Sequence, residues 1–167
     1  VDDCKWLDQN VFRMYLATDG PKLARGGNAI ASTLDFNSTK DEKNWIGFTH
    51  ENDLYYIQQI EPHTVWKVSS SDGTAERMYE SSTPWLEELA TRVSFQGSAT
   101  AVRYTEDLYL ALIQASSTEH SDTTLAYTFW AQPPFLVHEV SRPLKLQSSE
   151  LAFASSLSVV ADKIIVG

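Results

Sequence analysis

The stretch NWIGFTHENDLYYIQQIEPHTVWKV, residues 44–68, decides the fold class. It holds three short segments rich in aromatic and β-branched residues, at 44–48, 53–57 and 64–68. Apolar and polar side chains alternate in them with the period of two residues that is typical of β-strands. The polar residues 49–52 join the first two segments as a hairpin connection would. The stretch therefore predicts consecutive antiparallel strands.

The same pattern recurs along the chain. Four alternating strands begin with an acidic or amide residue, at Asn10, Asp53, Asp107 and Asp162, so their starts lie 43, 54 and 55 residues apart. That period is typical of β-propeller blades, which have roughly 40 to 50 residues and four antiparallel strands each. An innermost strand is predicted before each of the four, at 4–7, 44–48, 99–104 and 151–154. We expect about three and a half blades in one all-β domain over residues 1–167.

Further elements complete the predicted repeats. Third strands are expected at 28–34, 64–68 and 124–130, and outer strands at 75–79 and 136–140. Residues 84–90, PWLEELA, are the one stretch with helical spacing, and they predict a short helix in a connection between blades. Residues 116–123 are rich in Ser and Thr and predict an exposed loop.

Composition and charge exclude several classes of protein. The chain has 22 acidic and 13 basic residues, a formal charge of -9, and no basic stripe, which argues against nucleic acid as a partner. No apolar run approaches the ~18 residues of a membrane span. The single Cys4 rules out an internal disulfide, and the histidines lack ligand spacing, so neither a metal nor a cofactor is predicted. The chain starts without Met and stops in an apolar strand, from which we expect an incomplete propeller. Either further chain or another subunit completes it, or the sheet edge at Ile164 to Val166 is exposed.

Two longer strings carry a resemblance to a known family. Residues 42–48, EKNWIGF, are followed after a hairpin by residues 60–63, IEPH, and residues 134–143 read PFLVHEVSRP. The chain resembles the five-bladed β-propeller proteins related to glycoside hydrolases and mannoside phosphorylases over nearly its whole length. The resemblance implies a carbohydrate-active or carbohydrate-binding propeller whose ligand, a glycan or sugar phosphate, lies in the axial funnel. An active member would be a glycoside hydrolase, a phosphorylase or a glycosyltransferase-associated protein.

Two motifs of that family are altered in this chain. The acidic E-D-P-R-like motif is replaced by Asp2-Asp3-Cys4-Lys5, and a Y-x-H motif appears as Tyr127-Thr128-Phe129 without the histidine. These departures leave an alternative open, in which the propeller has lost catalysis and serves as an interaction or assembly module of a larger complex. Whether the chain is an enzyme therefore stays undecided at this point.

Candidate catalytic residues follow from the chemistry of glycosides. Hydrolysis generally needs two carboxyl groups, about 5 Å apart for retention or roughly 6.5 to 9.5 Å for inversion, whereas phosphorolysis can use one acid because phosphate is the nucleophile. Inner strands converge on the axis of a propeller. The acids best placed to meet there are Asp2, Asp3, Glu42 and Glu150. The alternative for each is a solvated carboxylate at a strand end.

Candidate ligand-binding residues are taken from the same inner segments: Lys5, Lys43, Asn44, Trp45, His63, Gln96 and Ser98. An indole such as that of Trp45 can stack on a pyranose ring, and an ammonium group can bind hydroxyls or phosphate. A tryptophan inside an apolar strand is more often a core residue than a ligand contact, and His63, directly after Pro62, is at least as compatible with a turn as with a binding site. Asn37 lies in a glycosylation sequon, which would matter in the secretory pathway. The sequence does not decide the compartment.

Overall fold

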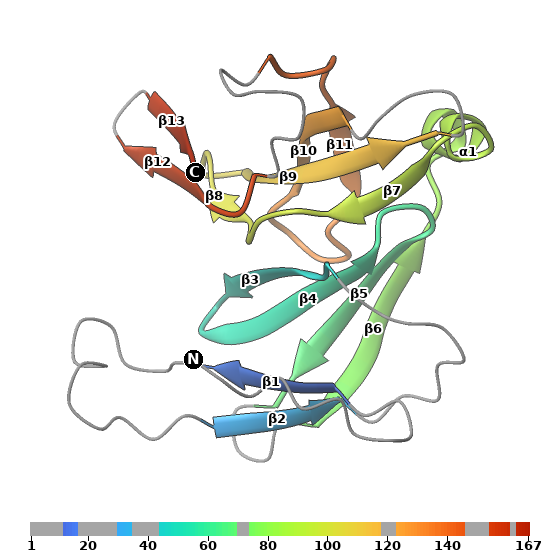
Figure 1. Ribbon diagram of the computed structural model, residues 1–167. Helices are drawn as coiled ribbons and strands as arrows, with labels where there is room; N and C mark the ends of the chain where they lie inside the picture. The colour runs from blue at the N-terminus through green and yellow to red at the C-terminus, as the bar shows by residue number, and fades with distance from the viewer. Residues whose placement is uncertain are drawn as a thin grey trace.

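The computed structural model describes residues 44–69, 74–117, 123–145, 154–160 and 163–167, together with the backbone of residues 12–16 and 30–34. It is an all-β structure with one short helix (Figure 1). The elements are β1 (Phe12–Leu16), β2 (Ile30–Leu34), β3 (Ile46–His50), β4 (Asp53–Gln59), β5 (His63–Val68), β6 (Ala75–Ser81), α1 (Pro84–Ala90), β7 (Ser94–Gly97), β8 (Val102–Arg103), β9 (Leu108–Ser116), β10 (Thr123–Trp130), β11 (Val137–Val140), β12 (Leu157–Val160) and β13 (Lys163–Val166). All described strand pairs are antiparallel. The prediction of an all-β fold is confirmed.

The strands of residues 44–81 form one four-stranded sheet in the order β3-β4-β5-β6. Strands β3 and β4 run up to a two-residue turn, Glu51-Asn52, whose φ angles of 50° and 69° are both left-handed. Such turns match the twist of a hairpin, and Asn tolerates this conformation better than most residues. The connection is shorter than the predicted 49–52 because Thr49 and His50 still pair with Leu54 and Asp53.

The second large sheet has the order β11-β10-β9-β7, and β8 pairs with β9 further along the same edge. Two short strands thus share one long partner: Gly97 of β7 pairs with Ile113, and Val102 of β8 pairs with Leu110. Strand β7 was not predicted, and the strand expected over residues 99–104 is confined to β8. The interruption between them lies at residues 98–101, where the backbone leaves the ladder.

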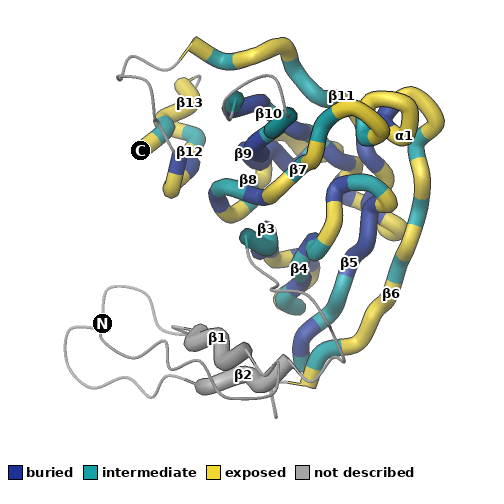
Figure 2. The backbone as a smooth tube through the Cα atoms, turned by 45° about the vertical axis from the view of Figure 1, so that its right-hand side comes forward, coloured by how far each residue is buried: buried dark blue, intermediate teal, exposed yellow. Residues whose placement is uncertain are grey.

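The main core lies between these two sheets (Figures 1 and 2), because buried apolar residues of both belong to one cluster. Phe48 of β3 lies at its centre. Its ring centroid is 5.1 Å from those of Tyr109, Phe129 and Phe135, and 5.4 Å from that of Tyr55. Close aromatic contacts of this kind add to the free energy gained from burial alone. The two sheets are therefore joined by one shared aromatic core.

A second cluster covers the opposite face of the β7–β11 sheet. It comprises Ala99, Leu110, Leu112, Ala154 and Leu157. Strand β9 is consequently buried on both faces, which explains its nearly continuous apolar sequence, LYLALI. The cluster also anchors the β12–β13 hairpin, because Leu157 is only 5% exposed.

The last hairpin corrects one expectation. Residues 151–154 were expected to pair with the final strand, but β13 pairs with β12, residue for residue from Leu157↔Val166 to Val160↔Lys163. Strand β12 is nearer to β13 in sequence than residues 151–154, so pairing with it closes a shorter loop and costs less chain entropy. The strands predicted at 75–79, 124–130 and 136–140 are confirmed as β6, β10 and β11, and the backbone of β1 and β2 agrees with those predicted from Asn10 and at 28–34. The strand predicted at 4–7 lies outside the described residues.

Helix α1 begins and ends where the sequence predicted. Pro84 occupies the first turn, where a missing backbone N–H costs nothing, and Leu86 is fully buried. The backbone N–H of Thr83 donates a hydrogen bond of 3.1 Å to the carboxylate of Glu61, which ties the start of the helix to the β4–β5 connection. The helix forms most of the connection from β6 to β7 (Figure 1).

Candidate functional site

Two amides meet where β3 and β7 lie side by side. The side-chain N–H of Asn44 donates a hydrogen bond of 2.9 Å to Oε1 of Gln96, although 52 residues separate the two in sequence. Asn44 precedes β3 with a left-handed φ of 62°, which Asn adopts more readily than other non-glycine residues. Within the part of the chain that the structure describes, the second polar atom of each amide has no partner. The pair thus offers one acceptor and one donor to a ligand.

Gly97 explains how the two strands come so close. A β-carbon on this residue would lie 2.1 Å from the backbone oxygen of Asn44 and 2.6 Å from Cγ1 of Ile46. The backbone N–H of Ala101 also donates a hydrogen bond of 2.9 Å to the carbonyl oxygen of Gly47. Side-chain volume at position 97 would separate the strands and with them the two amides.

Ser98 belongs to the same junction. Its backbone N–H donates a hydrogen bond of 3.0 Å to Leu112, and its hydroxyl donates one to the carbonyl oxygen of Ala154. The hydroxyl oxygen therefore still has lone pairs that can accept. Asn44 and Gln96 thus meet directly, and Ser98 follows the glycine that lies against Asn44; we call these three residues the inner junction.

Trp45 lies on the other face of β3 from the buried Ile46. Its ring stacks on Trp66 with centroids 6.1 Å apart and planes 29° apart, and it contacts Tyr56 at 6.3 Å. Trp66 is held in turn by a hydrogen bond of 2.8 Å from its Nε1 to Gln58. Trp66 thus occupies one face of the Trp45 indole.

His63 lies in the core and not at the inner junction. It is 1% exposed and shares a hydrogen bond between its Nε2 and the hydroxyl of Tyr127. Burial lowers the pKa of His63 to about 4, and burial together with Glu61 raises the pKa of Tyr127 well above its ordinary value. The pair is therefore neutral over the physiological range, and in this structure His63 is out of reach of a ligand in solvent.

The remaining predicted site residues lie outside the described residues. They are the four acids Asp2, Asp3, Glu42 and Glu150 and the two lysines Lys5 and Lys43. The distances between the carboxyl groups of the four acids, on which the choice between retention and inversion depends, therefore also lie outside the described residues. Cys4 and the sequon at Asn37 lie in the same undescribed parts of the chain.

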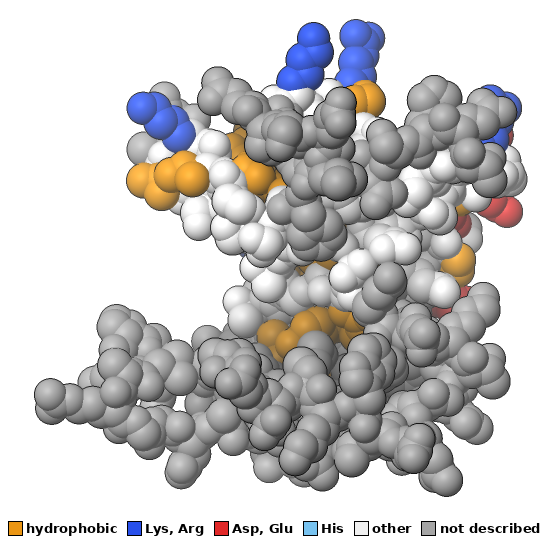
Figure 3. Space-filling model, viewed as in Figure 1, with side chains coloured by type: hydrophobic (Ala, Val, Ile, Leu, Met, Phe, Trp, Pro, Cys, Tyr) orange, Lys and Arg blue, Asp and Glu red, His pale blue; other side chains and the backbone are white. Residues whose placement is uncertain are grey.

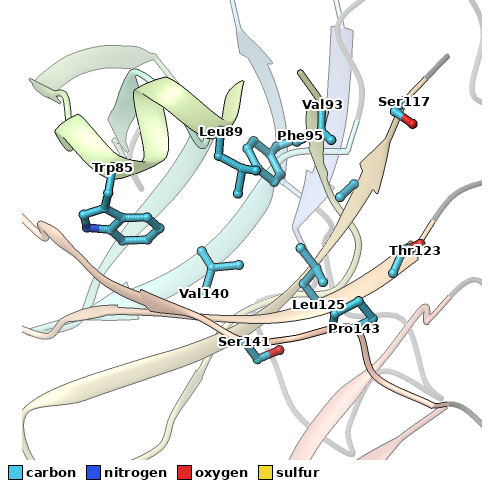
Figure 4. A pocket seen from close by; sticks show the side chains of 11 residues that line it. Trp85, Leu89, Val93, Phe95, Ser117, Thr123, Leu125, Val140, Ser141 and Pro143 are labelled. Carbon is cyan, nitrogen blue, oxygen red and sulfur yellow. The ribbon is translucent and has the colours of Figure 1, made fainter. Parts of the chain in front are cut away.

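Sequence reasoning missed an apolar pocket of about 320 Å³ between α1 and the β7–β11 sheet (Figure 4). Trp85 and Leu89 of the helix face Phe95, Leu125 and Val140 across it. The residues were visible as an amphipathic helix and as alternating strands, but nothing local indicated that they would meet. The hydroxyl of Ser141 at its rim is already used, since it accepts from Ala126 and donates to Arg142.

No group of three or more His, Cys, Asp or Glu residues is arranged to hold a metal ion among the residues described. In the same residues, no helix is long and apolar enough to cross a membrane.

The chain matched no protein-family model, no curated protein and no solved structure.

Proposed function

We propose that this chain forms consecutive blades of a β-propeller that binds a glycan or sugar phosphate at its inner junction. The arrangement of the strands supports this scaffold. Neighbouring strands of the β3–β6 sheet are consecutive in the chain, and those of the β7–β11 sheet nearly are. The two sheets pack face to face around the core that contains Phe48. Successive antiparallel sheets packed in this way are the building plan of a propeller. In such a propeller an axial ligand would lie where the first strands of successive blades approach each other, and the close approach of Gly97 to Asn44 and Ile46 supports this position for the site.

The observation that carries the ligand class is the Asn44–Gln96 amide pair. Side-chain amides combine a donor and an acceptor, and sugar hydroxyls need both. The pair is exposed and uses only part of its hydrogen-bonding groups. The tight contact at Gly97 keeps the two side chains in place. A preorganised donor and acceptor lose little entropy on binding a hydroxyl.

Binding is tested on a glycan array with single alanine variants. Asn44→Ala and Gln96→Ala should each weaken the best glycan about tenfold, since each removes roughly one hydrogen bond from the ligand. Gln132→Ala removes an exposed amide between β10 and β11 and serves as the matched control. Absence of glycan binding by the unaltered chain, or equal binding by all variants, would contradict the proposal.

Catalysis is a separate question, because the candidate acids are not described. In hydrolysis a carboxylic acid protonates the leaving oxygen while a carboxylate activates water or attacks the anomeric carbon; in phosphorolysis phosphate attacks instead. Turnover of aryl glycosides, with and without phosphate, should fall in Asp3→Ala or Glu42→Ala if either acid acts. Glycan binding without turnover in the unaltered chain would identify a binding module.

A second function, that of an assembly module, is favoured by one observation. Val160, Ile164 and Ile165 of the β12–β13 hairpin are 58%, 48% and 53% exposed, the most exposed of the large aliphatic side chains described. Exposed apolar residues grouped on one element are typical of surfaces that contact another protein.

A further inference from the structure

A row of polar side chains runs from the inner junction across the β7–β11 sheet. Gln96 of β7 lies directly opposite Gln114 of β9, and Gln114 lies directly opposite Thr124 of β10. Residues that face each other across antiparallel strands carry their side chains on the same face, with Cβ atoms about 4.5–5.5 Å apart. The hydrogen bond from Asn44 to Gln96 adds Asn44 to this row. We call the four side chains the amide row.

The hydrogen bonds of the amide row run in one direction. The side-chain N–H of Asn44 donates to Oε1 of Gln96. Further along, Nε2 of Gln114 donates a hydrogen bond of 2.9 Å to the hydroxyl oxygen of Thr124. The oxygen and the nitrogen of an amide diverge from a shared carbon, so Nε2 of Gln96 is left as a donor and Oε1 of Gln114 as an acceptor. These two groups belong to side chains that face each other on neighbouring strands.

The acceptor in the middle of the row is buried. Gln114 is only 4% exposed, and its Oε1 has no hydrogen-bond partner within the part of the chain that the structure describes. A buried amide oxygen without a partner costs free energy. Gln96 is exposed, and among the described residues its Nε2 has no partner either. One small molecule that accepts from Gln96 and donates to Gln114 would satisfy both.

We propose that a single water molecule bridges Gln96 and Gln114, which makes Gln114 the positioning residue of the proposed glycan site. Water accepts and donates at once, and buried waters in proteins typically satisfy polar groups of this kind. A glycan hydroxyl is a poorer candidate for the bridge, because Oε1 of Gln114 is buried. The bridge completes a continuous row from Asn44 to Thr124, in which each hydrogen bond strengthens the next.

The completed row determines what the inner junction offers to a ligand. Gln96 has two N–H groups on Nε2, and the bridge uses one of them, so the other remains for a ligand. If the Gln96 amide turned over by itself, its NH2 group would meet that of Asn44 and two donors would face each other. The row therefore presents an N–H at Gln96 and the oxygen Oδ1 at Asn44. A single sugar hydroxyl can accept from the first and donate to the second.

The surroundings of the inner junction suit such a ligand. Figure 3 shows mostly uncharged side chains and backbone over the described surface where Figure 1 places β3 and β7. The described part of this surface therefore offers a ligand hydrogen bonds rather than charge. The effect of Gln114 on ligand binding rests on the proposed function, whereas the bridge itself does not.

The bridge is tested without any glycan, through the side-chain amide signals of Gln96 in nitrogen–proton correlation NMR spectra. Gln96→Ala identifies these signals. Gln114→Leu removes the acceptor and Thr124→Val removes the hydroxyl that holds Gln114, so both should shift the Gln96 signals toward those of a freely solvated glutamine. Thr124→Ser keeps the hydroxyl and should leave the signals in place. Gln58→Leu is the matched control, since it changes an amide of the β3–β6 sheet that is bound to Trp66.

Two further measurements test the water and its effect on binding. A high-resolution crystal structure should place an oxygen atom within hydrogen-bond distance of both Nε2 of Gln96 and Oε1 of Gln114. Gln114→Leu and Thr124→Val should raise the dissociation constant of the best glycan about twofold or more, because an amide that turns freely holds its binding orientation no more than half of the time. Thr124→Ser should bind the glycan as the unaltered chain does.

The outcomes separate this proposal from the proposed function. Unchanged Gln96 signals in both Gln114→Leu and Thr124→Val, or a crystal structure without the bridging oxygen, would overturn the bridge even if glycans bind. Glycan binding that neither variant weakens would overturn the positioning role of Gln114. Signals that shift as expected in a chain that binds no glycan would support the bridge and contradict the proposed function.

Discussion

At the scale of single residues, the clearest consequence comes from a buried histidine. His63 has its Nε2 paired with Tyr127, while its Nδ1 is buried without a partner within the described part of the chain. An imidazolium in this place would be charged and poorly solvated. The lowered pKa of about 4 expresses that cost.

We predict that acid destabilises the protein through His63. Between its unfolded pKa of 6.5 and its folded pKa of about 4, the unfolded chain takes up a proton that the folded chain does not. The free energy of unfolding therefore has its full value above pH 6.5 and falls as the pH decreases, by about 3 kcal/mol once the pH is below 4. Urea unfolding at a series of pH values measures this change.

His63→Gln should remove this part of the pH dependence even if it lowers stability overall. The same substitution at the exposed His138 is the control and should leave the slope between pH 6.5 and 4 unchanged. If the free energy of unfolding had the same slope against pH in the unaltered chain and in His63→Gln, protonation of the His63 ring would not destabilise the folded protein.

The contacts of single residues were only partly predictable from sequence. Asn44, Gln96 and Ser98 are predicted from their place in inner segments, and the first two form a direct hydrogen bond. Their contact depends on a glycine 53 residues from Asn44, and no local pattern reports such a pairing. For His63 the sequence is compatible with either a ligand contact or a turn. Its place in the core depends on Tyr127, which lies 64 residues away, so no local pattern indicates it.

At the scale of elements, α1 was predicted with the correct limits because helical spacing and a proline at its start coincide. Its residues Leu86 and Leu89 differ sharply in burial, at 0% and 37% exposed. The helix is too short to be stable by itself, so packing of its buried side must hold it.

We predict that Leu86→Ala lowers the free energy of unfolding by about 2–5 kcal/mol, since it leaves a cavity beneath the helix. Leu89→Ala should cost much less, because Leu89 is partly solvated at the rim of the apolar pocket. Thermal or urea unfolding of both variants gives the comparison. Similar losses would mean that the helix is not anchored through Leu86.

The missed elements have a common cause. Strand β7, with sequence SFQG, has one large apolar residue and no alternation, and it is a strand only because β9 offers an edge to it. Sequence alternation predicts a strand at the apolar residues 151–154 and not at β12. Short strands receive their structure from their partners, so their own sequence indicates them weakly.

At the scale of the whole molecule, the two large sheets share one core and should behave as one folding unit. Phe48 connects them, as it contacts Tyr55 in its own sheet and Tyr109 and Phe129 in the other. A hydrogen bond of 2.6 Å from the hydroxyl of Tyr109 to the carbonyl oxygen of Thr49 joins them at the edge of this core.

We predict that Phe48→Ala lowers the free energy of opening in both sheets together, by about 3–5 kcal/mol. Hydrogen exchange followed by mass spectrometry would show this as faster exchange in peptides from β5 and from β9. Leu136→Ala, at a 44% exposed site, should change neither. Faster exchange in β5 alone would mean that the sheets are independent units.

Sequence periodicity predicted an all-β chain with repeating hairpins, because alternation is a local property. It did not predict which faces pack together, how the β12–β13 hairpin is anchored, or where pockets form. These depend on contacts between distant segments, such as those that bring Leu110, Leu112 and Leu157 into the second cluster. The predicted catalytic acids lie in parts of the chain that the structure does not describe.

The crowding around Gly97 has a consequence for mutational tolerance. In a library that samples all amino acids at every position, residue 97 should accept almost nothing but glycine, because the obstacle is the backbone oxygen of Asn44. Gly47 should be more permissive, because a β-carbon there meets only the ring of Tyr56, at 3.1 Å, and a side chain can turn aside. Variants of this chain could thus exchange the amides of the inner junction while the spacing between the sheets stays the same.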